Sequence, residues 1–400
     1  MNLKISDNQK FIINKWLHVA RIVYNKCVDY YNEKKGKIEL DYKKLKLSIF
    51  KMIPKRMLQR CPYNILSYEV KEFCSNIKAN LTQIKKEHTT HFTMAHKNTA
   101  IQQTISIETQ NINKNGFYTR FLGKIETLDK NFKFENIACD VKFTYDKVNK
   151  MYYIYAPEYI ERQKIEKRNS IASIDPGEKV FVALYGLDHV CKIGEDIRKP
   201  ILEYEKTIRI IQRRLSKTTN KRERERLKKA IRRKYKRIKG IVKELHNKTA
   251  LYLCKNYERI LIPKFETQKM ISNKTIKDNK KIIKEDSKTK EELQEKLKNY
   301  KKKVRLNSRV KFVLNMLSHY KFRQQLLAKA EEYGCEVEEV SEEYTSQCCG
   351  KCGRISKKYV KRIKHCPHCK MEIERDYNGS RNIMIKNIER MLRVKPETVL

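Results

Sequence analysis

Hydrophobic residues at helical spacing dominate the first quarter of the chain. They predict a helix that begins near Asn8, where Ser6 or Asp7 can provide the N-cap. The stripe consists of Phe11, Ile12, Trp16, Val19 and Val23. Helical spacing continues to about residue 86 and is interrupted by Pro54 and Pro62. We therefore expect a helical domain over residues 1–98, whose first residues can join a neighbouring sheet.

The pattern changes near Thr99 to short segments rich in β-branched and aromatic residues, separated by Asn, Lys and Gly turns. These segments are residues 102–109, 116–125, 137–145 and 152–156. They predict a small antiparallel β-barrel or sheet, which we assign to residues 99–167 as a β-barrel domain.

Strands and helices alternate from Ile171 to Val340, and this alternation indicates an α/β domain. Its predicted strands lie in residues 170–186, 259–265 and 334–340, and a lysine-rich insertion spans residues 273–306. We assign residues 168–346 to this domain and residues 373–400 to its final helix. The predicted fold class is therefore a multidomain α+β chain.

Positive charge is the strongest feature of the composition. The 400 residues include 91 Lys and Arg against 47 Asp and Glu, which gives a formal charge of +44 and a pI near 9.8. Such an excess points to a polyanionic partner, above all nucleic acid. Two predicted helices joined around residues 217–221 carry much of this positive charge, which can contact a phosphate backbone. The simpler alternative is that this charged face is only solvated. The candidate phosphate contacts are Arg213, Arg214, Arg222, Arg224, Arg226, Arg232, Arg233, Lys236 and Arg237.

We expect an intracellular protein without a membrane partner. Apolar runs fall short of the roughly 20 residues of a membrane span, and the N-terminus lacks the apolar core of a signal peptide. Seven cysteines are scattered singly, as expected of reduced thiols, so we predict no disulfides. These are Cys27, Cys61, Cys74, Cys139, Cys191, Cys254 and Cys335.

Two CxxC knuckles lie within residues 347–372, and basic, turn-prone sequence separates them. Four thiolates at this spacing can enclose Zn²⁺ in a tetrahedron, which leaves no open position for catalysis. The expected ligands of this structural zinc are Cys349, Cys352, Cys366 and Cys369. The neighbours Cys348, His365 and His368 are alternative ligands.

Carboxylates flank this zinc ribbon on both sides. Asp175 lies in an apolar strand, where a lone charge is costly unless it binds a cation, although an aspartate before Pro-Gly is also common in turns. Glu342 or Glu343 follows the last predicted strand, and Asp376 precedes the final helix. Hydrolysis of a phosphodiester by two hard cations about 4 Å apart needs such carboxylates from several elements.

Four segments carry a resemblance to a known family: IDPGEKVFVALYG, EVEEVSEEYTSQCCGKCG, HCPHC and RDYNGSRNI. Together they resemble the transposon-encoded TnpB and Fanzor proteins, which are RNA-guided nucleases related to type V CRISPR effectors. The resemblance covers residues 171–388. It implies a RuvC-like, ribonuclease H-type nuclease domain with an inserted zinc ribbon, preceded by a helical recognition domain and a wedge domain that match more weakly.

The resemblance also assigns site residues. Asp175 matches the first catalytic aspartate and Asp376 the last. The bacterial glutamate position falls at Pro263, which cannot ligate a metal through its side chain. Fanzor-type members instead carry a glutamate in a VxExYTS segment, and this places the role on Glu342. The substitutes are Glu343 and Glu266, and the auxiliary residues are Arg375 and Asn378.

The function implied is an RNA-guided DNA endonuclease in which Asp175, Glu342 and Asp376 hold two Mg²⁺ ions. Its partners would be a guide RNA from the element's own end and double-stranded target DNA, bound by a monomeric protein in a ribonucleoprotein. A eukaryotic or viral host would place it in the nucleus, and another host in the cytoplasm. The alternatives are an inactive nucleic-acid-binding accessory of transposition and a transposase with strand-transfer activity.

Overall fold

The computed structural model divides the chain into two compact units, Met1–Tyr159 and Ile160–Leu400, which we call the N-terminal and C-terminal units. The structure describes residues 2–34, 39–85, 91–99, 102–129, 131–163, 166, 169–265, 267, 306–355 and 362–392. Residues 273–305 of the predicted lysine-rich insertion and Glu266 lie outside the described residues.

Four helices open the N-terminal unit. The first, α1, starts as predicted: Ser6 caps it and forms a capping box with Gln9. Pro54 caps the short α3 and Pro62 precedes α4, so both prolines act as the predicted helix boundaries. The helices are α1 (Asp7–Glu33), α2 (Tyr42–Lys51), α3 (Lys55–Leu58) and α4 (Tyr63–Lys85).

The β-rich part of this unit is an open antiparallel sheet with the strand order β2-β6-β7-β1-β5. The expected closed barrel is wrong, because in the described residues the edge strands β2 and β5 do not pair with each other. The strands are β1 (Asn2–Lys4), β2 (Gln102–Ile107), β5 (Glu126–Thr127), β6 (Val141–Asp146) and β7 (Met151–Tyr155). Small elements connect them: η1 (Thr109–Asn111), β3 (Ile112–Asn113), β4 (Gly116–Phe117), α5 (Thr119–Leu122) and η2 (Phe134–Asn136).

Helices and sheet of the N-terminal unit share a single hydrophobic core. Trp16 and Val23 of α1, Phe73 of α4 and the sheet residues Ile105 and Phe143 belong to one buried cluster. The chain also returns to its start, because β1 pairs with both β5 and β7. The helical and β segments, which the sequence suggests as two domains, therefore form one unit.

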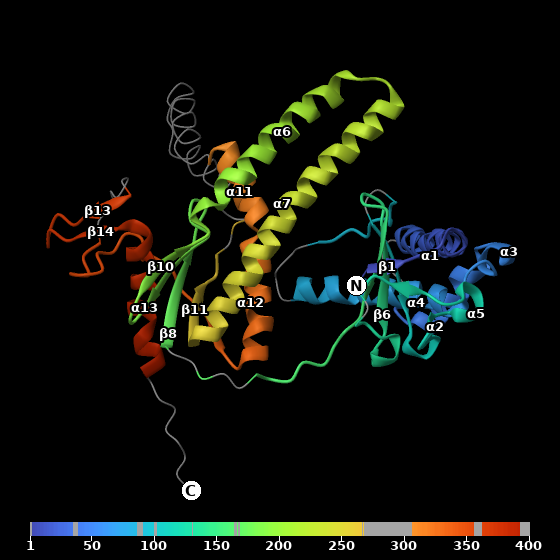
Figure 1. Ribbon diagram of the computed structural model, residues 1–400, viewed down its shortest axis with the longest axis horizontal. Coiled ribbons are helices and arrows are strands. Elements are labelled where there is room, and N and C mark those ends of the chain that lie inside the picture. Colours follow the sequence, from blue (N-terminus) through green and yellow to red (C-terminus); the bar gives the residue numbers. More distant parts are fainter. Residues whose placement is uncertain are drawn as a thin grey trace, which may run out of the picture. The chain divides into compact units, whose positions relative to one another are not determined.

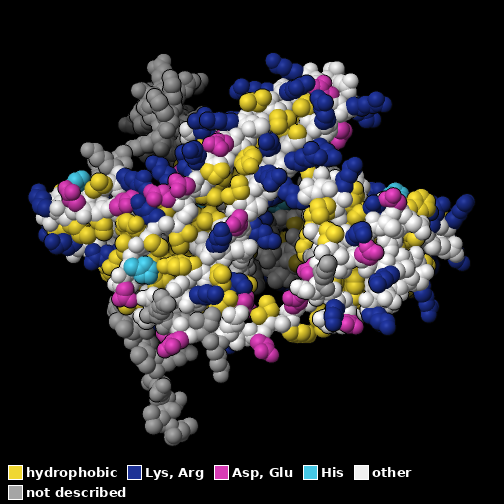
Figure 2. Space-filling model, in the orientation of Figure 1, with side chains coloured by type: hydrophobic (Ala, Val, Ile, Leu, Met, Phe, Trp, Pro, Cys, Tyr) yellow, Lys and Arg dark blue, Asp and Glu magenta, His cyan; other side chains and the backbone are white. Residues whose placement is uncertain are grey.

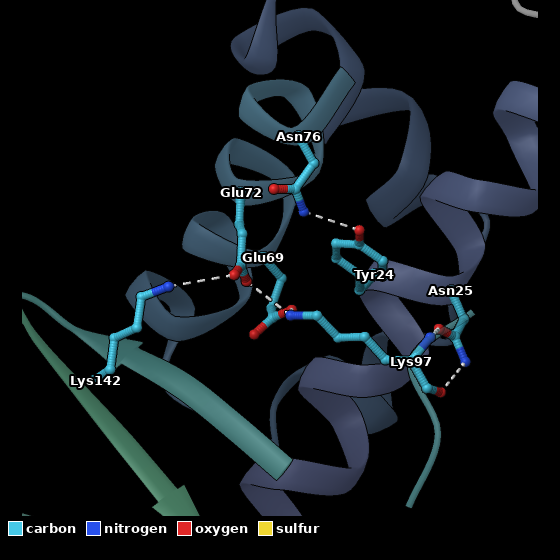
Figure 3. A network of polar contacts seen from close by, with 7 residues as sticks. All are labelled: Tyr24, Asn25, Glu69, Glu72, Asn76, Lys97 and Lys142. Atoms are coloured by element: carbon cyan, nitrogen blue, oxygen red, sulfur yellow. Dashed lines mark hydrogen bonds and ion pairs between the residues drawn. The ribbon is translucent and has the colours of Figure 1, made fainter. Parts of the chain in front are cut away.

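A buried polar network joins α1, α4 and the segment that leads to β2 (Figure 3). Lys97 Nζ lies 2.7 Å from carboxylate oxygens of both Glu69 and Glu72 and 4.3 Å from the ring centre of Tyr24. The ion pair with Lys142, at 3.6 Å, adds a second cation to Glu72. Burial raises the pKa of Glu69 to about 7, and Lys97 opposes this shift.

The C-terminal unit is built on a mixed five-stranded sheet with the order β10-β9-β8-β11-β12. The strands β10, β9 and β8 are antiparallel neighbours, whereas β8, β11 and β12 run parallel to one another. Parallel neighbours need crossover connections, and helices provide them here. The strands are β8 (Asn169–Pro176), β9 (Val182–Gly186), β10 (Val190–Ile193), β11 (Tyr257–Pro263) and β12 (Glu336–Val340).

Helices cover the two faces of this sheet unequally (Figure 1). On one face, residues of α6, α7, α11 and α12 pack with Ala172 and Ile174 of β8 in the larger core. On the other face, α13 packs with Ile171, Leu261 and Val340 through Ile383. The helices are α6 (Arg198–Lys217), which η3 (Glu195–Ile197) precedes, α7 (Lys221–Asn256), α11 (Ser308–Leu317), α12 (His319–Tyr333) and α13 (Arg375–Leu392).

The predicted helix at residues 313–330 is two helices, because Ser318 has a left-handed backbone with φ of 48° and ends α11. A hairpin of β13 (Ile363–His365) and β14 (Glu372–Glu374) carries the second CxxC knuckle. None of the helices in the described part of the chain combines the length and the apolar composition needed to cross a membrane.

We expect Glu69→Gln to flatten the pH dependence of the N-terminal unit's stability. Because burial raises the pKa of Glu69, its contribution is fully present below pH 4.5 and is lost as the pH rises through about 7. As the pH rises over this range, the contribution of Glu69 to the free energy of unfolding should fall by about 3 kcal/mol in wild type, and this fall should be absent in the variant. Urea unfolding followed by fluorescence of Trp16, the single tryptophan and a core residue of this unit, measures it.

The matched control is Glu135→Gln, because Glu135 is an exposed glutamate of the same unit. It should keep the wild-type pH profile. Parallel profiles for wild type and Glu69→Gln would contradict the prediction.

Candidate active site

Asp175 lies one residue before the end of β8, next to the parallel strand β11. Ser173 pairs with Leu261, so the position level with Asp175, two residues further along, is Pro263. Ser173 Oγ donates a 2.6 Å hydrogen bond to the carbonyl oxygen of Ser380 on α13. Since alternate strand residues share a face, Asp175 also faces α13.

Glu342 follows β12 by two residues. The register pairs Pro263 with Val340, so β8, β11 and β12 reach this edge of the sheet together. Glu342 is half-buried, whereas Glu343 is exposed. Burial raises the pKa of Glu342. Glu342 therefore follows the end of β12 on the side of the sheet where β8 ends with Asp175 and β11 ends with Pro263.

The third acid, Asp376, lies in the first turn of α13, and the same helix approaches Asp175 through Gly379. A Cβ at Gly379 would lie 2.3 Å from Asp175 Oδ2 and 3.4 Å from its Cγ. Only a residue without a side chain leaves room for the carboxylate. Sequence reasoning missed Gly379, because its neighbour is 204 positions away in the chain.

The three acids form an electrostatic cluster around Asp175. Burial is the largest cause that raises the pKa of Asp175 to about 7, and the charges of Glu342 and Asp376 add to it. Arg375 opposes the shift. Among the described residues, the acids that contribute to this shift are Glu342 and Asp376, which the resemblance also selects, and Glu343 is not one of the causes.

The residue types fit hard divalent cations, which prefer carboxylate oxygens and keep several water ligands. The three acids are not gathered tightly enough to enclose one ion by themselves. Among the described residues, the set whose ligand atoms all lie within 4.8 Å of one another is the four cysteines. Two cations about 4 Å apart can be shared by more widely spaced carboxylates.

Besides Gly379, sequence reasoning did not connect His319 to this site, and this histidine supports the turn after Asp175. His319, at the start of α12, is buried, and its Nε2 donates a 3.1 Å hydrogen bond to the carbonyl oxygen of Gly177. The ring stacks on Phe181 at 5.1 Å, and His246 stacks on Phe181 at 5.2 Å. Burial lowers the pKa of His319 to about 3, so this histidine is neutral and supports the turn as a hydrogen-bond donor.

The four predicted cysteine ligands converge. The sulfurs of Cys349 and Cys369 lie 3.5 Å apart, and those of Cys352 and Cys366 lie 3.6 Å apart. The cluster is compatible with a structural zinc ion. The alternative ligands lie outside it: Cys348 contacts backbone oxygens, His365 pairs with Glu372 and His368 contacts Arg354.

Helix α13 is tied to this four-cysteine module. Asn378 is fully buried, accepts a 2.9 Å hydrogen bond from the backbone of Gly350 and donates one to the carbonyl oxygen of Cys348. Both the oxygen and the nitrogen of the Asn378 amide therefore bind the backbone at the first knuckle and not a substrate. Buried Lys364 also donates to the carbonyl oxygen of Cys348.

Ion pairs fix the other side of the module to the sheet. Glu374, which directly precedes α13, accepts from Lys192 of β10 at 2.5 Å and from Arg362 at 2.8 Å. Arg362 also binds Glu195 at 2.6 Å. Because Glu374 and Asp376 are two residues apart, these contacts hold the start of α13 in place.

The predicted basic helices form a hairpin of α6 and α7, and Figure 2 shows Lys and Arg side chains distributed along it. Seven of the nine candidate phosphate contacts are exposed, whereas Arg224 and Arg232 are half-buried. Arg224 binds the carbonyl oxygens of Leu215 and Thr218 at the end of α6. Arg224 therefore stabilises the turn of the hairpin, and the exposed members offer a surface for a polyanion.

Two family models match the chain. One is described as a probable transposase, OrfB of the IS605 type, and matches residues 152–274; the other is the Cas12f1-like TNB domain and matches residues 319–383. A TnpB-like protein of Acanthamoeba polyphaga mimivirus is 25% identical over 94% of this chain and 70% of its own length. A CRISPR-associated endodeoxyribonuclease Cas12f1 of Sulfoacidibacillus thermotolerans is 38% identical over 19% of this chain and 18% of its own.

A solved Cas12f1 complex with sgRNA and target DNA aligns with 94% of this chain and 82% of its own at 13% identity and a TM-score of 0.45. Because this structural similarity is weak, the fold is described from the strand order β10-β9-β8-β11-β12 and not from the alignment. The acidic cluster and the four-cysteine module fit the class of transposon-associated proteins that the first family model describes. The matches to that model, to the TNB domain and to the relatives support the TnpB-like family.

Substitution of Gly379 by alanine should disturb the acidic cluster without unfolding the chain. The new Cβ would displace the Asp175 carboxylate, whose oxygen lies 2.3 Å away. We expect weaker binding of Mn²⁺, by roughly tenfold, in a calorimetric titration. Gly240→Ala is the control, because Gly240 lies within α7 with no atom within 4 Å of its Cβ position. Equal Mn²⁺ affinity in both variants would contradict this role.

We expect the purified chain to carry about one zinc ion per molecule. Cys366→Ser should abolish zinc binding and lower the melting temperature, because the cluster loses one of its four sulfurs. Metal analysis by mass spectrometry and calorimetry measure the two effects. Cys348→Ser is the control and should retain zinc; zinc loss in this variant would show a different ligand set.

Proposed function

We propose that this protein is an RNA-guided DNA endonuclease of a transposable element, which cuts the phosphodiester backbone in a RuvC-like site. The observation that carries the proposal is the convergence of Asp175, Glu342 and Asp376 where β8 and β12 end and α13 begins. The strand order, with three antiparallel strands followed by two parallel ones, agrees with a ribonuclease H-type sheet.

In the proposed mechanism the three carboxylates would hold two Mg²⁺ ions. Bound there, the ions would supply an activated water molecule and stabilisation of negative charge on the phosphodiester. The chain itself supplies the orientation: Gly379 leaves room for Asp175, and His319 holds the turn that follows it. The raised pKa of Asp175 reflects burial first and the charges of Glu342 and Asp376 second, and divalent cations would stabilise the ionised carboxylates against both.

Nucleic acid would bind along the basic hairpin, where α6 and α7 present exposed arginines to phosphate groups. The guide would be an RNA from the element's own end, and base pairing would read the sequence of double-stranded target DNA. The Cas12f1 relative, whose name describes an endodeoxyribonuclease, supports DNA as the substrate. The protein would act as a monomer in a ribonucleoprotein.

A transposase with strand-transfer activity is the second candidate, because one matching family model carries the description of a probable transposase. A nuclease would release ends and leave them unjoined. Tagged donor DNA, followed by sequencing for joined products, separates the two activities.

The central experiment purifies the protein from cells that carry the element's flanking DNA, sequences the RNA that copurifies and tests Mg²⁺-dependent cleavage of a matched plasmid. Wild type should cut, whereas Asp175→Asn, Glu342→Gln and Asp376→Asn should each lose at least about a hundredfold in rate, because each removes a proposed cation ligand.

The matched control is Glu343→Gln, which changes the exposed neighbour of Glu342 and should cut at nearly the wild-type rate. If a discrete RNA is bound but wild type never cuts, the chain is a guided binding protein and not a nuclease. If Glu343→Gln is inactive and Glu342→Gln is active, the assignment of the middle carboxylate is wrong.

A further inference from the structure

Glu342 lies outside the strands of every sheet in the part of the chain that the structure describes. We call residues 341–350 the Glu342 segment. It follows the last residue of β12, and its local order comes from tight turns, such as the bond from Thr345 Oγ1 to the carbonyl oxygen of Glu342 at 2.8 Å. A ligand on such a segment is less precisely placed than one on a strand.

Side chains of α13 bind the backbone on both sides of Glu342. Lys386 Nζ donates to Ser341 Oγ at 3.0 Å and to the carbonyl oxygen of Glu343 at 3.1 Å. Asn387 donates to the carbonyl oxygen of Ser341 at 3.3 Å. The residues before and after Glu342 are therefore both attached to the same helix.

The same helix holds the rest of the segment. Asn382 is buried and donates through its Nδ2 to the carbonyl oxygens of Thr345 and Cys348, each at 2.8 Å. One turn earlier, Asn378 binds Cys348 and Gly350. Positions 378, 382 and 386 are spaced by four residues, so their side chains follow one side of α13.

We propose that α13 is a template that positions Glu342. The helix already carries Asp376 and accommodates Asp175 at Gly379, and its row of Asn378, Asn382, Lys386 and Asn387 sets the Glu342 segment against the same frame. These four are positioning residues, because they act on the segment's backbone and not on a reacting atom.

The need for such a template follows from Pro263. In a ribonuclease H-type site a glutamate on β11 would be fixed by strand pairing, but the position level with Asp175 is a proline. The acid that replaces it comes from a loop, so its placement has to be restored by side-chain contacts. This inference rests on the proposed role of Glu342 as a cation ligand.

The test uses the full-length, zinc-loaded chain and Mn²⁺, which binds the same oxygen ligands as Mg²⁺. Lys386→Ala removes both contacts that flank Glu342 from an exposed position, and Asn382→Ala removes the buried ones. Both should raise the Mn²⁺ dissociation constant by roughly tenfold. Hydrogen exchange in residues 341–350 should become faster without added Mn²⁺ while zinc content stays at the wild-type value, and Lys386→Ala, which changes an exposed side chain, should also keep the wild-type melting temperature.

Two further variants complete the design. Lys386→Arg keeps a donor at this position and should restore Mn²⁺ affinity, whereas Ile385→Ala changes an exposed neighbour on α13 and should behave like wild type. Glu342→Gln defines the loss expected when the ligand itself is removed.

Wild-type Mn²⁺ affinity in both Lys386→Ala and Asn382→Ala overturns the template, and so does loss of zinc in Lys386→Ala. If Glu342→Gln binds Mn²⁺ like wild type, Glu342 is no ligand and the template is also overturned. If the variants behave as expected but wild type cuts no DNA, the proposed function fails and the template stands.

Discussion

Repulsion between carboxylates that must stay close together is the constraint on which the C-terminal unit depends. Asp175 lies at the end of β8, Glu342 follows β12 and Asp376 begins α13; burial raises the pKa of Asp175 to about 7, and the charges of Glu342 and Asp376 add to this shift. A protein gains nothing in stability from such an arrangement. The arrangement persists because two hydrophobic cores hold the elements that carry the three acids in place. The larger core lies on one face of the sheet, and the smaller one lies under α13 on the other face.

Helix α13 connects the sheet, the acidic cluster and the four-cysteine module of this unit. It packs on the sheet through Ile383, leaves space for Asp175 at Gly379 and reaches the first cysteine knuckle through Asn378. The ion pairs of Glu374 fix its start to β10 and to the hairpin of the second knuckle. The four-cysteine module and the acidic cluster are therefore neighbours on one scaffold, although separate segments of sequence encode them.

Local patterns in the sequence were sufficient for the helices of the first unit, the α6–α7 hairpin, the cysteine set and the strand of Asp175. Closure of a sheet depends on which edges pair, so the sequence could not distinguish a barrel from the open sheet that the structure has. Gly379, His319 and Asn382 were missed for a related reason. Their roles depend on partners far away in the chain, and a glycine, a helical histidine and a helical asparagine carry no local signal of such contacts.

Lys364 places a buried positive charge beside the four-cysteine cluster. Its ammonium group is buried, and burial lowers its pKa while the sulfurs of Cys349, Cys348, Cys366 and Cys352 oppose that shift. A divalent ion with four thiolates carries a net double negative charge, which is the counter-charge that a buried ammonium requires. Lys364 also donates hydrogen bonds to the carbonyl oxygens of Gln347 and Cys348, and the charge of the loaded module would add to these contacts. We therefore expect zinc loading to stabilise the folded interior around Lys364, because the positive charge of the ammonium and the negative charge of the metal–thiolate group attract each other.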